Sequence, residues 1–211
     1  GYSSNPWFNA GSMKTEGWDF DLSYTDNFNG WNFKISANGS AYENKVLSLG
    51  AENELVGNVT KTEVGKPINY FYGYRTDGLF QNQAEIDAHA FQNVNTSPGD
   101  IRFVDLKDDD VINTEDRTMI GNPFPDLTYG GNIFVEKGGF DLNITCSGVL
   151  GNEIYRLPSW GGFESPIGRQ NLLSFAGDYW SVDNKHNDVT KPRPIWNDPN
   201  NNNRISDYFI E

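Results

Sequence analysis

The residues between positions 100 and 117 are the ones whose types and spacing could do chemistry. The stretch reads D-I-R-F-V-D-L-K-D-D-D-V-I-N-T-E-D-R and is rich in carboxylates. Counted from Asp105, it fits a twelve-position calcium loop, in which oxygen ligands stand at positions 1, 3, 5, 7, 9 and 12. The predicted ligands are four side chains and one main-chain carbonyl, those of Asp105, Asp109, Asn113, Asp116 and, through its carbonyl, Val111.

Two positions depart from the calcium-loop pattern. Lys107 stands at position 3, where an ammonium group would repel a cation, and Asp110 stands at position 6, where glycine normally permits a left-handed turn. The alternative is an acidic surface turn without metal, with Lys107 and Arg117 as internal counterions. Glycosidase chemistry would need two opposed carboxylates at a fixed separation. Adjacent Asp residues in one acidic run do not provide that geometry, so we expect no enzyme activity.

The composition restricts the class of protein that surrounds this stretch. The chain has 211 residues, of which 36% are hydrophobic and 14% aromatic, and its formal net charge is −13. It is too aromatic for disorder and too polar for a large ordinary core, so a β-structure with one apolar and one wet face is expected. The negative charge disfavours nucleic-acid binding. The single cysteine, Cys146, excludes an internal disulfide framework and a multi-cysteine zinc site.

Four segments alternate between apolar and polar residues with period two, which predicts β-strands. They are 17–25, 30–39, 127–136 and 139–150. Within each pair the connection is short and rich in Asn and Gly, which is typical of hairpin turns. The other connections, 44–121 and 151–205, are very long. This layout predicts an all-β fold, an antiparallel segment of a transmembrane β-barrel with short periplasmic turns and two long extracellular loops.

Two other classes of protein remain open from the residues alone. A soluble carbohydrate-binding β-sandwich would also alternate, but it would bury an apolar core between two sheets. That core would consist of Trp18, Phe20, Trp31, Phe33, Leu142 and Ile144. The polar residues on the opposite face favour the water-filled lumen of a barrel instead. A secreted glycoside hydrolase fragment is the other alternative, and it would need opposed carboxylates in a cleft.

Several motifs occur together and in order along the chain. They include N-A-G-S-M-K-T-E-G-W-D-F-D-L-S-Y at 9–24, V-G-K-P-I-N-Y-F-Y-G-Y-R-T-D-G-L-F-Q at 64–81, P-G-D-I-R-F-V-D at 98–105 and I-G-N-P-F-P-D-L-T-Y-G-G-N at 120–132. With these motifs the chain closely resembles the C-terminal part of the SusC/RagA family of TonB-dependent outer-membrane transporters. Related transporters carry a similar acidic loop, so the resemblance also points to calcium in the 105–116 loop.

The resemblance implies a portion of a barrel, 1–211, from which the plug domain and the remaining strands are absent. It implies a bacterial outer-membrane location in contact with lipid, and import of oligosaccharides or peptides. The expected partners are a SusD-like surface lipoprotein, which closes over the extracellular loops, and TonB, reached through the missing N-terminal part. Loop aromatics would contact the substrate or this lid, or else pack the loops against each other. They are Tyr72, Tyr74, Trp160, Phe163, Trp180 and Trp196.

Overall fold

The structure is a computed structural model that describes residues 11–156, 179–185, 191–195 and 198–211. The chain divides into two compact units. One comprises residues 1–70 and 122–154, and the other comprises residues 71–121 and 155–211. Within the described residues, no helix is both long enough and apolar enough to span a membrane.

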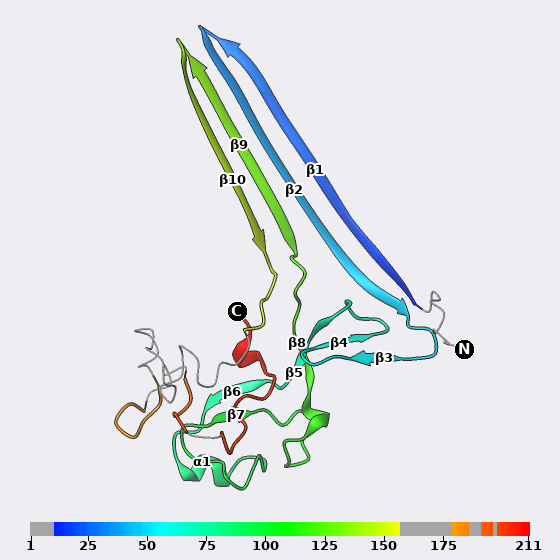
Figure 1. Ribbon diagram of the computed structural model, residues 1–211, viewed down its shortest axis with the longest axis vertical. Coiled ribbons are helices and arrows are strands. Elements are labelled where there is room, and N and C mark those ends of the chain that lie inside the picture. The colour runs from blue at the N-terminus through cyan, green and yellow to red at the C-terminus, as the bar shows by residue number, and fades with distance from the viewer. Residues whose placement is uncertain (1–10, 157–178, 186–190, 196–197) are drawn as a thin grey trace, which may run out of the picture. The chain divides into compact units, whose positions relative to one another are not determined.

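The first unit is built on a four-stranded antiparallel sheet (Figure 1). Its strands are β1 (Ser12–Phe28), β2 (Trp31–Ser48), β9 (Leu127–Lys137) and β10 (Phe140–Leu150), and their order across the sheet is β1-β2-β9-β10. The two hairpins predicted from the alternation are therefore present, and β2 and β9 join them side by side. The sheet is open in the described chain, with β1 and β10 at its edges, as befits a barrel segment.

The two hairpin turns are as short as antiparallel geometry allows. Asn29 and Gly30 have φ angles of 49° and 78°, and Gly138 and Gly139 have φ angles of 59° and 83°. Two successive positive φ angles define the type I′ turn, whose twist matches that of the flanking strands. The first strand continues to Phe28, so its turn is shorter than the sequence suggested. The second strand reaches Ser48 and extends well beyond the predicted boundary at 39.

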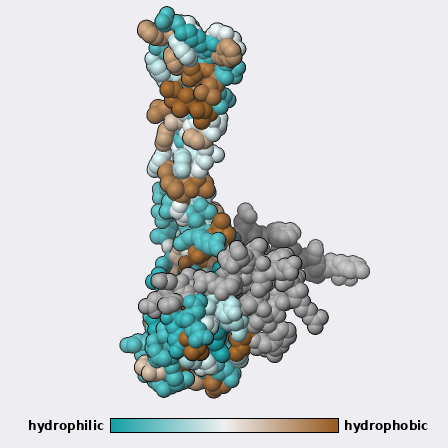
Figure 2. All heavy atoms as spheres, turned by 90° about the vertical axis from the view of Figure 1, so that its left-hand side faces the viewer, coloured by the Kyte–Doolittle hydropathy of each residue, from teal (hydrophilic) through white to brown (hydrophobic). Residues whose placement is uncertain are grey.

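The register places most of the large apolar side chains of the hairpins on one face of the sheet. The exceptions on the opposite face are Met13, Tyr42, Val46, Phe134 and Val149. Across the middle of the sheet, Tyr24 pairs with Ile35, Ile35 with Ile133, and Ile133 with Ile144. The opposite face is polar and carries hydrogen bonds between strands. Ser40 Oγ and Thr128 Oγ1 lie 2.7 Å apart, and Asn132 Nδ2 donates to Asn143 Oδ1 at 2.6 Å. Figure 2 shows the apolar side chains gathered along the hairpins.

The apolar face is about as tall as the lipid-facing band of an outer-membrane barrel. It runs along β1 from Trp18 to Phe28, and the ten residue steps between them span about 33 Å at a rise of ~3.3 Å per residue. A strand tilted by about 40° then covers a band roughly 25 Å tall, as in outer-membrane barrels. Trp18 lies inside β1, which begins at Ser12. Beyond it the same face carries charged residues, Lys14 and Glu16 on β1 and Glu43 and Lys45 on β2.

The exposure of the apolar face contradicts the β-sandwich alternative. That alternative required Trp18, Leu142 and Ile144 to lie in a dry core between two sheets. Their exposed fractions are 54%, 57% and 51%, and no second sheet covers them in the part of the chain that is described. A lipid-facing surface needs no such cover because the hydrocarbon chains supply it.

The long connections contain short elements and a small core of their own. In the first unit β3 (Glu54–Val56) pairs with β4 (Thr60–Glu63). In the second unit β5 (Tyr70–Gly73) pairs with β8 (Thr118–Gly121), and β6 (Thr76–Leu79) pairs with β7 (Ile101–Phe103). Among the described residues three short helices accompany them, α1 (Gln83–Asp87), η1 (Thr114–Asp116) and η3 (Asp207–Phe209). The core of the second unit consists of Leu79, Ile101, Phe103, Ile112 and Trp180.

Candidate functional site

The acidic loop folds around the carboxylate of Asp105. One oxygen of this carboxylate accepts hydrogen bonds from the main-chain N–H groups of Lys107 at 3.1 Å and Asp108 at 2.7 Å. The other oxygen accepts from the N–H of Asp110 at 2.8 Å. Desolvation by itself would raise the pKa of Asp105, but these main-chain donors outweigh it and hold the pKa below its ordinary value. The chain thus supplies the positive partial charges that the carboxylate needs.

A second carboxylate, that of Asp116, closes the same loop. Asp116 is fully buried. One of its oxygens accepts from the main-chain N–H groups of Leu106 and Lys107 at 2.9 and 3.1 Å, and the other accepts from the N–H of Asn113 at 2.8 Å. The Asn113 side chain accepts in turn from the N–H of Glu115 at 2.7 Å, so a capping box begins the helix η1. Both ends of the loop are therefore fixed by side chains that satisfy its own main chain.

The predicted ligand set is brought into one loop. Asp109 accepts from the N–H of Val111 at 3.1 Å, and Asp110 adopts the left-handed conformation that position 6 requires, with a φ angle of 63°. Within the described residues, however, no group of three or more acidic, histidine or cysteine side chains stands close enough to hold a metal ion. The calcium site made of Asp105, Asp109, Val111, Asn113 and Asp116 therefore stays a prediction.

Lys107 and Arg117 were expected to be the counterions of a metal-free turn, but the structure does not pair them with its carboxylates. Arg117 donates to the main-chain oxygen of Tyr72 at 3.0 Å, and its guanidinium group lies 4.4 Å from the centroid of the Tyr72 ring. Among the described residues, neither Arg117 nor Lys107 forms an ion pair with a carboxylate of the loop. The main-chain N–H groups take the role that we had assigned to the two cations.

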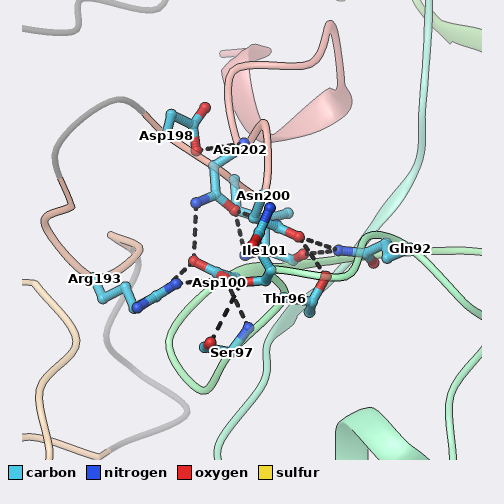
Figure 3. Close-up of polar contacts among 10 residues, drawn as sticks. Gln92, Thr96, Ser97, Asp100, Ile101, Arg193, Asp198, Asn200 and Asn202 are labelled. Carbon is cyan, nitrogen blue, oxygen red and sulfur yellow. Dashed lines mark hydrogen bonds and ion pairs between the residues drawn. The ribbon is translucent and has the colours of Figure 1, made fainter.

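A fully buried carboxylate, Asp100, is the centre of a second polar cluster in the same unit (Figure 3). Arg193 donates from Nε and Nη2 to the two carboxylate oxygens of Asp100, at 2.8 and 3.0 Å. Asn202 Nδ2 donates to the carboxylate at 3.1 Å, and the main-chain N–H of Ser97 donates at 2.9 Å. This bidentate ion pair with two further donors is the arrangement that makes a buried charge tolerable.

Two buried asparagines extend the cluster to the strand β7. Asn202 Oδ1 accepts from the main-chain N–H of Ile101 and from Asn200 Nδ2, both at 2.8 Å. Asn200 Oδ1 accepts from Thr96 Oγ1 at 2.6 Å and from Gln92 Nε2 at 3.3 Å. Figure 3 shows these side chains pointing toward one another from segments that lie about a hundred positions apart in the sequence.

The segment that carries the asparagines is itself a compact turn. The Asp198 carboxylate accepts from the main-chain N–H groups of Asn202 and Asn203 at 2.8 and 2.9 Å. Arg204, which follows the turn, lies with its guanidinium group 5.0 Å from the centroid of the Phe103 ring. Burial lowers the pKa of Arg204 from its ordinary value. The turn and its arginine thus attach the C-terminal segment to the core of the unit.

The predicted contact aromatics lie in different surroundings. Tyr72 and Tyr74 are half-buried, and the ring of Tyr74 packs 5.6 Å from that of Phe103. Burial raises the pKa of Tyr74. Trp180 is 6% exposed, and its Nε1 donates to Gln81 Oε1 at 3.0 Å, so it occupies the packing role that was the alternative to ligand contact. The other predicted contact residues, Trp160, Phe163 and Trp196, lie outside the described residues.

Sequence reasoning missed the cluster around Asp100. Asp100 was noted only as part of the acidic stretch and of the P-G-D-I-R motif, and residues 198–204 were treated only as part of the long connection 151–205. The available signal was the run of four asparagines at 200–203, which is dense in amide side chains. That signal does not say which amides meet which carboxylate.

The comparisons with known proteins agree with the fold. No protein-family model matches the chain. Two relatives are TonB-dependent receptors of Formosa agariphila: receptor P26 is 30% identical over 197 residues and receptor P3 is 28% identical over 197 residues. Each alignment covers 87% of this chain and 19% of the relative, so the chain spans about a fifth of the length of these curated relatives.

The solved structure of the RagAB peptide transporter superposes with a TM-score of 0.68 at 20% identity, over 96% of this chain and 21% of that one. The RagAB peptide importer in its closed-closed state gives a TM-score of 0.66 over 95% of this chain. The fold is therefore that of a β-barrel transporter segment. Together with the sequence matches, it makes the chain a portion of a SusC/RagA-like TonB-dependent receptor. Receptors of this class are proteins of the bacterial outer membrane, which is where this chain belongs.

Proposed function

We propose that the receptor containing this chain imports oligosaccharides or peptides across the outer membrane, together with a SusD-like surface lipoprotein and with energy supplied through TonB. One observation carries the proposal. The chain combines a lipid-facing band about 25 Å tall with long connections that fold into a cross-linked unit at residues 71–121 and 155–211. The described parts of these connections are cross-linked by hydrogen bonds and an ion pair, which suits a surface that must hold a substrate or a partner.

The similarity to named transporters supports this proposal. The matched relatives bear the name TonB-dependent receptor, and the matched structures are described as a peptide transporter or importer. The clusters around Asp105 and Asp100 use their carboxylates to bind main-chain and side-chain donors of the chain itself. We therefore assign them to the architecture of the connections and not to a reaction.

Uptake by cells that carry the full-length receptor tests the proposal. Labelled oligosaccharides and peptides are offered to wild-type cells, to cells without the receptor and to cells in which TonB is inactive. We expect accumulation of one substrate class only in the wild type. Co-purification of a surface lipoprotein with the tagged receptor tests the partner. Equal accumulation in all three strains would remove the importer proposal.

A further inference from the structure

The apolar band between Trp18 and Phe28 carries charged side chains at one end only. On the described strands, every residue of this face within the band is uncharged except Asp26 on β1 and Lys137 on β9. Both stand near the hairpin turns, at the end where β1 joins β2 and β9 joins β10 (Figure 1). A charge on a lipid-facing surface is costly at the midplane of the membrane and is tolerated near an interface. The two residues therefore mark the height at which this face meets lipid headgroups.

The Lys137 side chain lies over an aromatic ring. Its Nζ atom is 4.5 Å from the centroid of the Trp31 ring on the neighbouring strand. The Trp31 ring is in turn stacked on that of Phe33, with centroids 6.1 Å apart and an interplanar angle of 17°. Lys137 is exposed and forms no ion pair with any described residue. The ring contact positions the ammonium group, and the three N–H donors of that group can bind an anion at the same time.

The Asp26 carboxylate is held by its own strand. Tyr24 Oη donates to Oδ2 at 2.8 Å, and the main-chain N–H of Asn27 donates to Oδ1 at 2.7 Å. A carboxylate has about four acceptor positions, so each oxygen can accept a further donor. Asp26 is exposed, and among the described residues no cation pairs with it. The carboxylate can therefore accept a cation that approaches from the lipid side.

The two charges are spaced to meet one group that is itself both positive and negative. Asp26 pairs with Phe33, and Phe33 pairs with Val135 on β9, which is the strand of Lys137. Two strand spacings of ~4.8 Å separate the strands of Asp26 and Lys137 by about 10 Å. The Lys137 ammonium group shortens this interval because it reaches back over Trp31 on β2. A headgroup with a phosphate and an ammonium a few bonds apart fits across what remains.

The orientation of the strands identifies the source of that headgroup. The short turns of outer-membrane barrels lie on the periplasmic side, so this end of the apolar face meets the inner leaflet of the membrane. That leaflet consists of phospholipids. The ethanolamine headgroup combines a phosphate with an ammonium, whereas the glycerol headgroup has a phosphate alone. The carboxylate of Asp26 attracts the first and repels the second.

We propose that the hairpin end of the lipid-facing surface binds the headgroup of phosphatidylethanolamine, with its phosphate at Lys137 and its ammonium at Asp26. The site continues the lipid-facing band that the strands already define. It does not depend on which substrate the receptor imports.

Zero-length cross-linking of the full-length receptor tests this inference. The receptor is placed in nanodiscs that contain phosphatidylethanolamine and phosphatidylglycerol in equal amounts, and a water-soluble carbodiimide is added. The reagent couples a carboxylate to an amine that touches it, and mass spectrometry of the peptides locates the amide. We expect phosphatidylethanolamine on Asp26. Glu43 measures chance encounters, because it is exposed on the same face of the sheet just beyond the other end of the band.

Lys137→Met is the decisive variant, since it removes the charge that positions the phosphate and keeps an apolar side chain beside Trp31. It should lower the yield of the Asp26 amide roughly three- to fivefold, as expected for the loss of one exposed ion pair. Lys34→Met is the matched control, because Lys34 is exposed on the polar face of β2, and it should leave the yield unchanged.

Three results would overturn the inference. The first is a yield at Asp26 no higher than at Glu43. The second is equal yields at Asp26 in the two lysine variants. The third is an amide between Asp26 and a lysine of the receptor, which would show that a neighbouring barrel strand meets the carboxylate and that a lipid does not.

Discussion

Arg193 and Asp100 form a bidentate ion pair, with Nε and Nη2 at 2.8 and 3.0 Å from the two carboxylate oxygens. The pair joins residues 93 positions apart, and the Asp100 side chain is 0% exposed. Because the main-chain N–H of Arg193 also donates to the carbonyl of Gly99 at 2.8 Å, the pair attaches the late part of the chain to the P-G-D turn. The ion pair and the main-chain hydrogen bond therefore link two segments of the second unit that are distant in the sequence.

Asp100→Asn should destabilise the second unit by about 3 kcal/mol, because it leaves the partly buried guanidinium group of Arg193 without its counterion. Asp77→Asn provides the control, since it breaks the ion pair with Arg102 at a side chain that is 69% exposed and should cost at most about 1 kcal/mol. Hydrogen exchange of residues 191–204 in the full-length receptor measures both. Equal protection in the two variants would show that the buried pair is not what holds the segment.

Gly99→Ala should destabilise the same turn by steric overlap. A Cβ atom at Gly99 would lie 2.3 Å from the Trp180 ring, and the φ angle of Gly99 is +90°. Gly65→Ala is the matched control, because Gly65 has a φ angle of +91° and open space around its Cβ position. The control should lose only the backbone preference, about 1 kcal/mol. Thermal unfolding of the two variants gives the difference, and similar melting temperatures would exclude the overlap.

The acidic loop should lose stability as the pH falls. The pKa of Asp105 is lowered in the folded loop, so the carboxylate stabilises the fold above its ordinary unfolded pKa, and this contribution disappears as the pH drops through the folded pKa. Asp105→Asn should remove the pH dependence. The measurement is the hydrogen exchange of residues 105–116 in the wild type and the variant at matched pH values. A wild-type loop that loosens with rising pH would have the wrong sign.

Calcium removal tests the metal prediction directly. Main-chain N–H groups already occupy the carboxylate oxygens of Asp105 and Asp116, so we expect chelation to change the protection of the 105–116 loop by little. Hydrogen exchange in calcium and in chelator measures it, with residues 198–204 as an internal reference. A large calcium-dependent gain in protection confined to the loop would instead establish the predicted calcium site.

The sequence was informative where local physics decides the structure. Alternation with period two predicted which side chains share a face, because neighbouring residues of a strand point to opposite sides. Asn29-Gly30 predicted a tight turn because both residues tolerate positive φ angles. Long-range partners were not predictable in this way. Nothing local shows that Asn202 meets Asp100, because that contact depends on how two distant turns pack.

The extent of β2 was only partly predictable from the sequence. Its alternation fades after residue 39, yet pairing with β1 carries the strand on to Ser48. The end of the β2–β9 ladder was readable in principle from Pro123 and Pro125, since proline interrupts a ladder. What the sequence could not show was where residues 64–68 return to β2.

The two faces of the sheet should respond in opposite ways to the same substitution. Leu22 lies near the middle of the apolar band and is 66% exposed, whereas Ser23 beside it faces the polar side. Leu22→Arg should cost about 2–4 kcal/mol, because it places a charge at the midplane of the membrane, and Ser23→Arg should cost much less because it faces water. Unfolding of the full-length receptor in lipid vesicles measures the difference. Equal costs would mean that neither side chain faces lipid, and a larger cost at Ser23 would reverse the assignment of the faces.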